Sequence, residues 1–558
     1  MLGPLLRHVD TTTASLWVET SDAATVTVEA AGRSWSQRTF AVHGHHYALV
    51  EIDGLEPGSK APYVVRLDDV QVWPEADSPF PPSVIATLVP DKPLRLMFGS
   101  CRTSVRHDEQ GNRTHGVDAL RALSRRMCLD ESVAWPDMVL FLGDQVYADE
   151  TTAEMHDFIE SRRSIKEPPG KELKDYEEYA HLYFLAWTDP ANRWLLSTMP
   201  TAMIFDDHDV RDDWNTSLAW KQKMDATEWW HGRIVSGLSS YWVYQHLGNL
   251  SPEERAEDQL WQRVVAHDGE GELDLSAAVD ELSERVDRDP EEYRWSYSRD
   301  LAGVRLIVLD SRAARVLDPD ARAMLDPQEL AWLDAQMQGG FKHLLIGTSL
   351  PFLLPPGLHH LEAWNEAVAG GAWGERLKGF GEWARQTVDL EHWAAWQRTY
   401  QQVADMATEV ADGRRGPAPD TVTFLSGDVH HSYVSEVRRR SGSRIVQAVC
   451  SPIRNPLPRF FRFLTAVLAY AIAGPMGRLV SRSAHVPRPP FTWRKLAGPW
   501  FDNAIATLED RDEGLLLRWE KGVVGDDPHA SWLELVDERL ITPRGRGAAR
   551  GGRSRRPR

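Results

Sequence analysis

Carboxylate-rich runs follow two apolar segments of the chain. Asp144 and Tyr147 come directly after DMVLFL, in the run GDQVYADE, and Asp207 and His208 come after TAMIF. The second run, DDHDVRDD, places five aspartates within eight positions. Carboxylates at that density cannot all stay ionised near a closed site unless a cation offsets their repulsion. Both runs therefore indicate metal binding.

Two further apolar segments end in nitrogen or sulfur ligands. TVTFL precedes SGDVHHS, which supplies Asp428, His430 and His431, and LRLMF precedes GSCR, which supplies Cys101 and Arg102. A guanidinium beside the cysteine would lower the pKa of the thiol and favour the thiolate that binds metals. The same guanidinium has the planar shape that suits phosphate oxygens.

Each run also has a structural explanation. An aspartate can cap a helix, an acidic run can be an exposed loop, a histidine can be a core residue, and a cysteine can be a small buried apolar side chain. Four such runs, each at the end of a different apolar segment, are hard to explain as independent coincidences. Together they predict one shared metal site.

The segments that carry these runs are short and continuously apolar, as strands of a sheet covered on both faces must be. In α/β folds the chemistry lies on loops beyond the strand ends, and every polar run falls there. We therefore expect an α/β catalytic domain over residues 91–540, with an acidic helical insertion at residues 251–293.

The two ends of the chain follow other patterns. Over residues 1–90, apolar and polar residues alternate in ASLWVET, TVTVEA, HHYALVEI and APYVVRL, which predicts an all-β sandwich module. LEPGSKAPYVV resembles a hairpin of fibronectin-type modules. Residues 543–558 carry seven arginines and no acid, and we expect a disordered Arg/Gly-rich tail there.

The ordered set FGSC, GDQVYAD, DDHDVRDDWN and GDVHHS resembles the motif series of PhoD-type alkaline phosphatases, within the calcineurin-like metallophosphoesterases. The likeness covers about residues 94–453. It implies a two-sheet α/β sandwich flanked by helices and preceded by a fibronectin- or immunoglobulin-like β module. It also implies two or more metal ions and hydrolysis of a phosphomonoester or phosphodiester.

Carried over residue by residue, the resemblance implies two neighbouring metal sites. The first would use four ligands: Cys101, Asp144, Tyr147 and His430. Asp144 would bridge to a second ion that is also bound by Asp207 and Asp428. A phenolate and a thiolate suit Fe(III), and an oxygen-only neighbour suits a hard cation such as Ca(II).

The resemblance also suggests roles around the metals. We expect a metal-activated hydroxide to attack phosphorus in line, His208 to protonate the leaving group and Arg102 to clamp the phosphate. Four further residues could line a substrate pocket or form structural hydrogen bonds: Arg312, His359, His360 and His431.

Two other functions remain open at this stage. A lipid phosphodiesterase of phospholipase D type is suggested by the Arg-flanked apolar segment at residues 460–477, which is too short to span a bilayer but could contact a membrane surface. A buried helix is the alternative for that segment. The other function is a catalytically inactive, metal-stabilised binding module.

Composition narrows the partners and the compartment. A net charge of -19 argues against a general nucleic-acid binder. Three cysteines do not suggest a disulfide framework, and the N-terminus has no signal-peptide pattern, so the sequence favours a cytoplasmic location. Nothing in the sequence specifies an oligomeric state.

Overall fold

The computed structural model describes residues 1–90, 92–130, 132–458, 473–525 and 530–544. The predicted disordered tail falls almost wholly outside the described residues, as does most of the apolar segment at residues 460–477. Within the described chain, no helix has the length and apolar character needed to cross a membrane.

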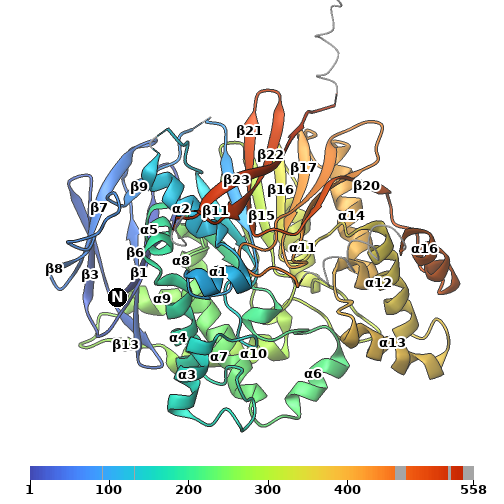
Figure 1. The fold of residues 1–558 in the computed structure, drawn as a ribbon, viewed down its shortest axis with the longest axis horizontal. Coiled ribbons are helices and arrows are strands. Elements are labelled where there is room, and N and C mark those ends of the chain that lie inside the picture. The colour runs from blue at the N-terminus through green and yellow to red at the C-terminus, as the bar shows by residue number, and fades with distance from the viewer. Residues whose placement is uncertain (91, 131, 459–472, 526–529, 545–558) are drawn as a thin grey trace, which may run out of the picture.

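The N-terminal strands form two packed antiparallel sheets, at the left of Figure 1. One sheet contains β1 (Leu2–Val9), β2 (Ala14–Thr20), β6 (His45–Ile52) and β5 (Phe40–Val42). The other contains β4 (Arg33–Arg38), β3 (Thr25–Ala30), β7 (Lys60–Leu67) and β8 (Val70–Trp73), with β9 (Val84–Ala86) beside β7. Their alternating residues place Val26, Val28 and Tyr63 in a common core, as the period-two pattern predicts.

Two larger sheets form the centre of the molecule. The first has the order β12-β11-β10-β21-β22-β23, and the second has the order β14-β15-β16-β17-β19-β18-β20. Strands β10 (Arg95–Gly99), β11 (Met138–Leu142) and β12 (Thr201–Ile204) are parallel. So are β15 (Val304–Leu309), β16 (His343–Thr348), β17 (Thr421–Ser426) and β19 (Arg444–Val449). The predicted two-sheet α/β sandwich is confirmed.

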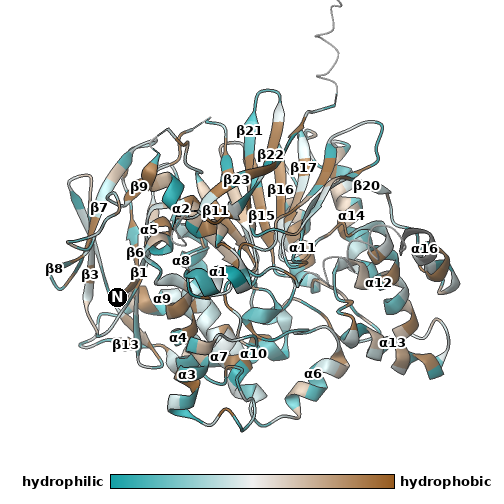
Figure 2. Cartoon of the chain, in the orientation of Figure 1, coloured by the Kyte–Doolittle hydropathy of each residue, from teal (hydrophilic) through white to brown (hydrophobic). Residues whose placement is uncertain are grey.

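These parallel strands are almost continuously buried, and their ribbons are largely brown in the hydropathy colouring of Figure 2. Where the two sheets meet, an added Cβ at Gly347 of β16 would lie 3.1 Å from Leu142 of β11. Strand ends from both sheets thus lie close together. The loops that carry the predicted ligands start at these ends.

The C-terminal strands complete both sheets, which the sequence patterns above do not predict. β18 (Ser432–Val437) and β20 (Trp493–Trp500) close the second sheet, and β14 (Tyr297–Leu301) lies at its other edge. β21 (Ala504–Arg511), β22 (Gly514–Val523) and β23 (Trp532–Ile541) extend the first sheet in antiparallel order from β10. In Figure 1 these red strands lie at the upper centre of the molecule.

Helices cover the sheets and the N-terminal module. Those between β10 and β14 are α1 (Glu109–His115), α2 (Ala119–Leu129), α3 (Ala153–Arg162), α4 (Tyr176–Trp187), α5 (Pro190–Thr198), α6 (Leu218–Asp225), α7 (Trp230–Tyr241), α8 (Pro252–Glu257), α9 (Gln259–Ala266) and α10 (Ser276–Arg288). The later ones are α11 (Pro327–Gln336), α12 (Pro356–Ala369), α13 (Glu375–Thr387), α14 (Gln397–Ala411) and α16 (Ala473–Ser483). Helices α12, α13 and α16 gather at the right of Figure 1.

The acidic insertion at residues 251–293 is helical, as predicted, and it also binds the N-terminal module. Its short strand β13 (Leu273–Asp274) pairs in parallel with β5, and His43 Nε2 lies 2.9 Å from Asp280 Oδ1 of α10. The insertion therefore joins the first sheet of the module to the helices beside the catalytic sheets.

We expect Gly143→Ala to destabilise the fold, because Gly143 has a φ of +97° and an added Cβ would lie 2.6 Å from Asp206 Cβ. Gly303→Ala is the matched control, since Gly303 has a φ of +82° but open space around it. Backbone strain should cost each variant about 1–2 kcal/mol in free energy of unfolding. Overpacking should cost Gly143→Ala about 1–3 kcal/mol more. Equal denaturant midpoints for the two variants would contradict the close approach at Gly143.

Candidate metal centre

Four of the predicted ligands share an unusual backbone conformation. Cys101 has a φ of 58°, Asp144 of 50°, Asp428 of 63° and His430 of 49°. Residues with a Cβ rarely adopt this left-handed region, and each such residue costs of order 1–3 kcal/mol unless its surroundings enforce it. The sharp turns after β10, β11 and β17 therefore direct these side chains toward one another, and the backbone of these turns is locally strained.

The first group of ligand atoms combines sulfur, oxygen and nitrogen. Cys101 Sγ, a carboxylate oxygen of Asp144 and a ring nitrogen of His430 all lie within 4.8 Å of one another. Tyr147 is buried beside them, and its hydroxyl donates to Asp144 Oδ2 at 3.3 Å. The structure thus brings together the four residues predicted for the first ion.

The second group consists of carboxylates. Asp206, Asp207 and Asp428 form one cluster within 4.8 Å, and Asp144, Asp207 and His208 form another. Asp144 therefore belongs both to the sulfur-containing group and to a group with Asp207, as a bridging ligand would. Asp206 was not predicted as a ligand, although it stands next to Asp207 in the same acidic run.

The electrostatics of these groups favour cations. Burial and the neighbouring aspartates raise the pKa of Asp144 well above its usual value, and burial and Asp207 do the same for Asp206. Asp144 Oδ1 and Asp206 Oδ2 are buried oxygens without a hydrogen-bond donor among the described residues. Buried carboxylate oxygens normally require such a partner or a cation. The residues present therefore fit metal ions.

The structure corrects the expectation for the Cys101 thiol. Its pKa is raised well above the usual value, first by burial and then by the charges of Asp144 and Asp428. Arg102 does not oppose this effect, because its guanidinium lies 2.9 Å from Asp118 Oδ2 and donates to the Ala186 carbonyl at 2.8 Å. In this structure the thiolate would need a bound cation rather than Arg102.

The same contacts place the Arg102 side chain away from the ligand groups. Both partners are buried, and Asp118 caps α2 through the amide of Leu120. A guanidinium held in this way links β10 to α2 and α4. The predicted phosphate-clamping role for Arg102 therefore has no support in these contacts.

Arg312 lies against the carboxylate group. It is fully buried, with Nε 2.5 Å from Asp206 Oδ1, Nη2 3.0 Å from Asp207 Oδ1 and Nη1 bonded to Glu391 Oε2. Arg315 Nη1 lies 3.1 Å from the same Glu391 oxygen. Of the two explanations open for Arg312, the contacts favour an internal ion-pair network over a free substrate contact.

His208 is held at the open side of the site. Its Nδ1 lies 2.8 Å from Asp149 Oδ1, its ring lies 4.9 Å from the Tyr147 ring, and its side chain keeps 16% of its exposure. Burial lowers the pKa of His208, but the charge of Asp149 outweighs this and the pKa is raised well above its usual value. Asp149 thus fixes the orientation of the ring.

Two residues of the site lie on a loop after α13 that the sequence patterns missed. His392 Nε2 lies 2.9 Å from Asp428 Oδ2, and its Nδ1 lies 2.8 Å from Glu362 Oε1. The hydrogen bond from His392 outweighs the effect of burial and lowers the pKa of Asp428 to about 2. His392 and Glu391 follow a helix in DLEHWAAW rather than an apolar strand, so the strand-end rule could not find them.

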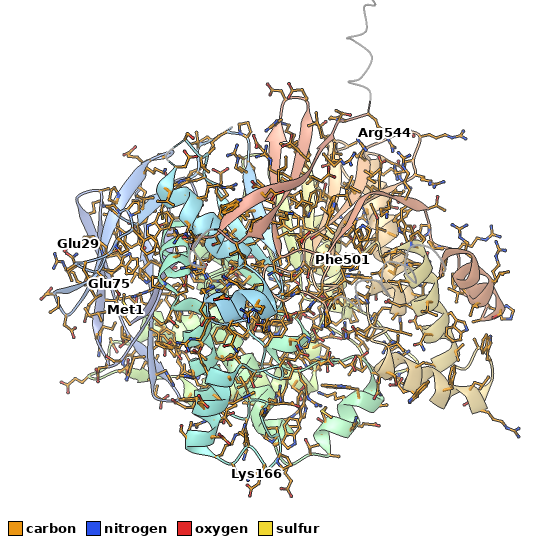
Figure 3. The ribbon with its side chains drawn as sticks, viewed as in Figure 1. Met1, Glu29, Glu75, Lys166, Phe501 and Arg544 are labelled. Atoms are coloured by element: carbon orange, nitrogen blue, oxygen red, sulfur yellow. The ribbon has the colours of Figure 1, made fainter. Side chains whose placement is uncertain are left out.

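The three remaining histidines predicted for the pocket have different surroundings. His359 is a core residue whose ring packs 4.7 Å from Tyr400 and 4.9 Å from Trp493. His360 is half-buried and lines a separate pocket with Arg478 and Arg482. His431 Nδ1 lies 2.7 Å from the Val429 carbonyl, and its ring lies 5.5 Å from Phe501, labelled in Figure 3.

A family model described as PhoD-like phosphatase matches residues 116–460, more than half of the chain. The chain belongs to the PhoD-like phosphatase family. A second model, a domain of unknown function, matches residues 1–85, which include the N-terminal strands. No curated protein matches in sequence.

A solved structure shares the fold at low sequence identity, and a second one is also similar. A structure titled "Structure of PhoD" is 12% identical, with a TM-score of 0.56 over 96% of this chain and 90% of that one. A purple acid phosphatase from yellow lupin (Lupinus luteus) seeds is 9% identical, with a TM-score of 0.48 over 96% of this chain and 73% of that one. Membership in the PhoD-like family implies that the chain is a phosphatase that uses metal ions, and the ligand groups above are the candidates for binding them.

We expect Arg312→Met to lower the free energy of unfolding of chelator-treated protein by about 3–5 kcal/mol, because it leaves Asp206 and Asp207 without their buried counter-charge. Arg305→Met, on the strand β15 that precedes Arg312, is the control. Its partner Asp300 is 71% exposed, so the loss should stay below about 1 kcal/mol. Similar losses in both variants, measured by denaturant unfolding, would show that Arg312 does not carry the network.

Proposed function

We propose that this PhoD-like phosphatase hydrolyses phosphoesters at a centre of two or more metal ions. One observation supports this more than any other: Asp144 belongs to a group with Cys101 and His430 and also to a group with Asp207. A carboxylate shared between two groups suits two adjacent cations. Two such cations would polarise the phosphoryl group and lower the pKa of water.

The ligand sets suit two different metals. We propose Fe(III) for the site with Cys101, Tyr147 and His430, because thiolate, phenolate and imidazole favour a transition metal. We propose Ca(II) for the site with Asp207 and Asp428, because hard cations prefer oxygen ligands.

The chain's own groups would orient the substrate and move a proton. His208 lies beside Asp144 and Asp207 on the partly exposed side of the centre, and Asp149 fixes its ring. We propose that His208 Nε2 donates a proton to the oxygen that leaves phosphorus. The charge of Arg312 would hold Asp206 and Asp207 in place while substrate binds.

We expect His208→Ala to lower the turnover of aryl phosphates by about 100-fold or more. Metal content should stay unchanged if His208 acts as an acid, and should fall if it is a ligand instead. His231→Ala is the control, since that side chain is 72% exposed on α7. Full activity of His208→Ala would remove the proposed proton donor.

We expect Cys101→Ala to lose about one equivalent of iron while calcium is retained, because the thiolate belongs to only one ligand group. Cys450→Ala is a matched control: Cys450 is also fully buried, but its sulfur contacts the Ala504 carbonyl. Elemental analysis of the purified proteins gives both counts. An equal iron content in Cys101→Ala and in the wild type would show that Cys101 is not a ligand of the iron.

A lipid phosphodiester is a second candidate substrate, favoured by an exposed apolar face. Leu377, Phe380 and Trp383 of α13 are 39%, 45% and 59% exposed, and they repeat at helical spacing. Large exposed patches of this kind often contact membranes or partners. The loop that follows α13 carries Glu391 and His392 of the site. A membrane bound at this face of α13 would therefore contact a helix that directly precedes residues of the metal centre in the sequence.

We expect wild-type protein to sediment with anionic liposomes and Phe380→Glu/Trp383→Glu to bind at least about tenfold more weakly, because charge on this face opposes burial in lipid. Hydrolysis of a soluble aryl phosphate should be equal in both proteins. No liposome binding by the wild type, together with hydrolysis of monoesters only, would dismiss the lipid candidate.

A further inference from the structure

A polar cavity of about 460 Å³ lies among α8, α9, α10, the chain at residues 290–296 and the first turn of α11. None of its wall residues belongs to the ligand groups of the candidate metal centre. Its size falls in the range of small-molecule sites, and most of its wall residues belong to the acidic insertion at residues 251–293. The cavity has no role in the proposed phosphatase reaction.

One wall of the cavity is His246, which is 1% exposed. Neither of its ring nitrogens has a hydrogen-bond partner among the described residues. Burial lowers its pKa to about 3, so the ring is a neutral imidazole with one lone pair free to accept. His246 ends a π-helical turn (Trp242–His246), a rare widening of a helix that often occurs at functional sites.

A second buried polar group, Glu329, lines the same cavity. It is 3% exposed, and its Oε1 has no donor in the part of the chain that the structure describes. Burial raises its pKa to about 8, so the carboxyl is mostly neutral at pH 7. A cation beside it would favour the ionised form. Two of the residues that line the cavity therefore carry buried acceptors without a donor.

The charge of the walls selects the ligand. Eight carboxylates line the cavity against three arginines, an excess that repels anions. A coordinated metal ion is a poorer fit, because every metal-type ligand group found among the described residues lies elsewhere. Tyr293 adds an aromatic wall, and its hydroxyl already donates to Asp258.

We propose that this cavity binds a small organic cation with primary ammonium groups, of the aliphatic diamine or polyamine class. One ammonium group donates hydrogen bonds to a ring nitrogen of His246 and to Glu329 Oε1. An ammonium has three N–H donors, so it can satisfy both acceptors. The aliphatic chain lies along Tyr293, and the second ammonium reaches carboxylates of the rim, such as Glu257 and Glu281. The site is separate from the metal centre, and it does not depend on the proposed reaction.

Calorimetric titration of the full chain with 1,4-diaminobutane tests the proposal. We expect one molecule bound per chain, and at least about tenfold weaker binding by both cavity variants. His246→Phe removes an acceptor from the buried ammonium, and Glu329→Gln removes the negative charge that the ammonium would stabilise. Glu513→Gln, on the exposed turn between β21 and β22, is the matched control and should bind like wild type. Circular dichroism confirms that each variant is folded.

Two further titrations define the chemistry. Butane-1,4-diol has the same length without charge and should not bind, and MgCl₂ at equal ionic strength should not compete with the diamine. Absence of diamine binding to wild type, unchanged affinity in both cavity variants, equal binding of the diol, or full competition by Mg²⁺ would each overturn the proposal.

Discussion

Repulsion among buried carboxylates is the constraint on which the rest of this structure depends. Asp144, Asp206, Asp207 and Asp428 converge from three loops into one small volume, and burial makes their charges expensive. Positive charges must therefore lie close to these carboxylates. Arg312 supplies one from inside the protein, and the ligand groups leave room for others to come from metal ions.

The packing of the two sheets brings those loops together. β10, β11 and β12 deliver Cys101, Asp144 and the acidic run from one sheet, while β15 and β17 deliver Arg312 and Asp428 from the other. Asp209 ties the loops to each other, because its Oδ2 accepts from the amides of both Asp144 and Asp206. Left-handed backbone at the ligands is tolerated because packing and hydrogen bonds hold it from both sides.

Strand ends could be predicted from sequence because a buried parallel strand leaves a local signal, a short apolar run followed by polar residues. That signal located Cys101, Asp144, Asp207 and Asp428, and the structure brings all four together. The direction in which a side chain points leaves no such signal in the sequence. Arg102 stands next to Cys101 in the chain, yet its partner Asp118 turns it toward α2. His392 reaches Asp428 from a loop after a helix, a pairing that only tertiary contacts create.

The position of Arg312 explains the asymmetry of the centre. On the side of Cys101, Tyr147 and His430 the ligands can be neutral until a cation binds, so no internal counter-charge is needed there. On the other side the ligands are carboxylates, and Arg312 and Arg315 also bind Glu391. Arginine stays charged even when buried, so it can stabilise this side before any metal arrives. It also reduces the charge that an incoming cation must neutralise. In the assignment that we propose, the carboxylate side would therefore hold the cation of lower charge, and the side with Cys101 and Tyr147 would hold an ion that can deprotonate its own ligands.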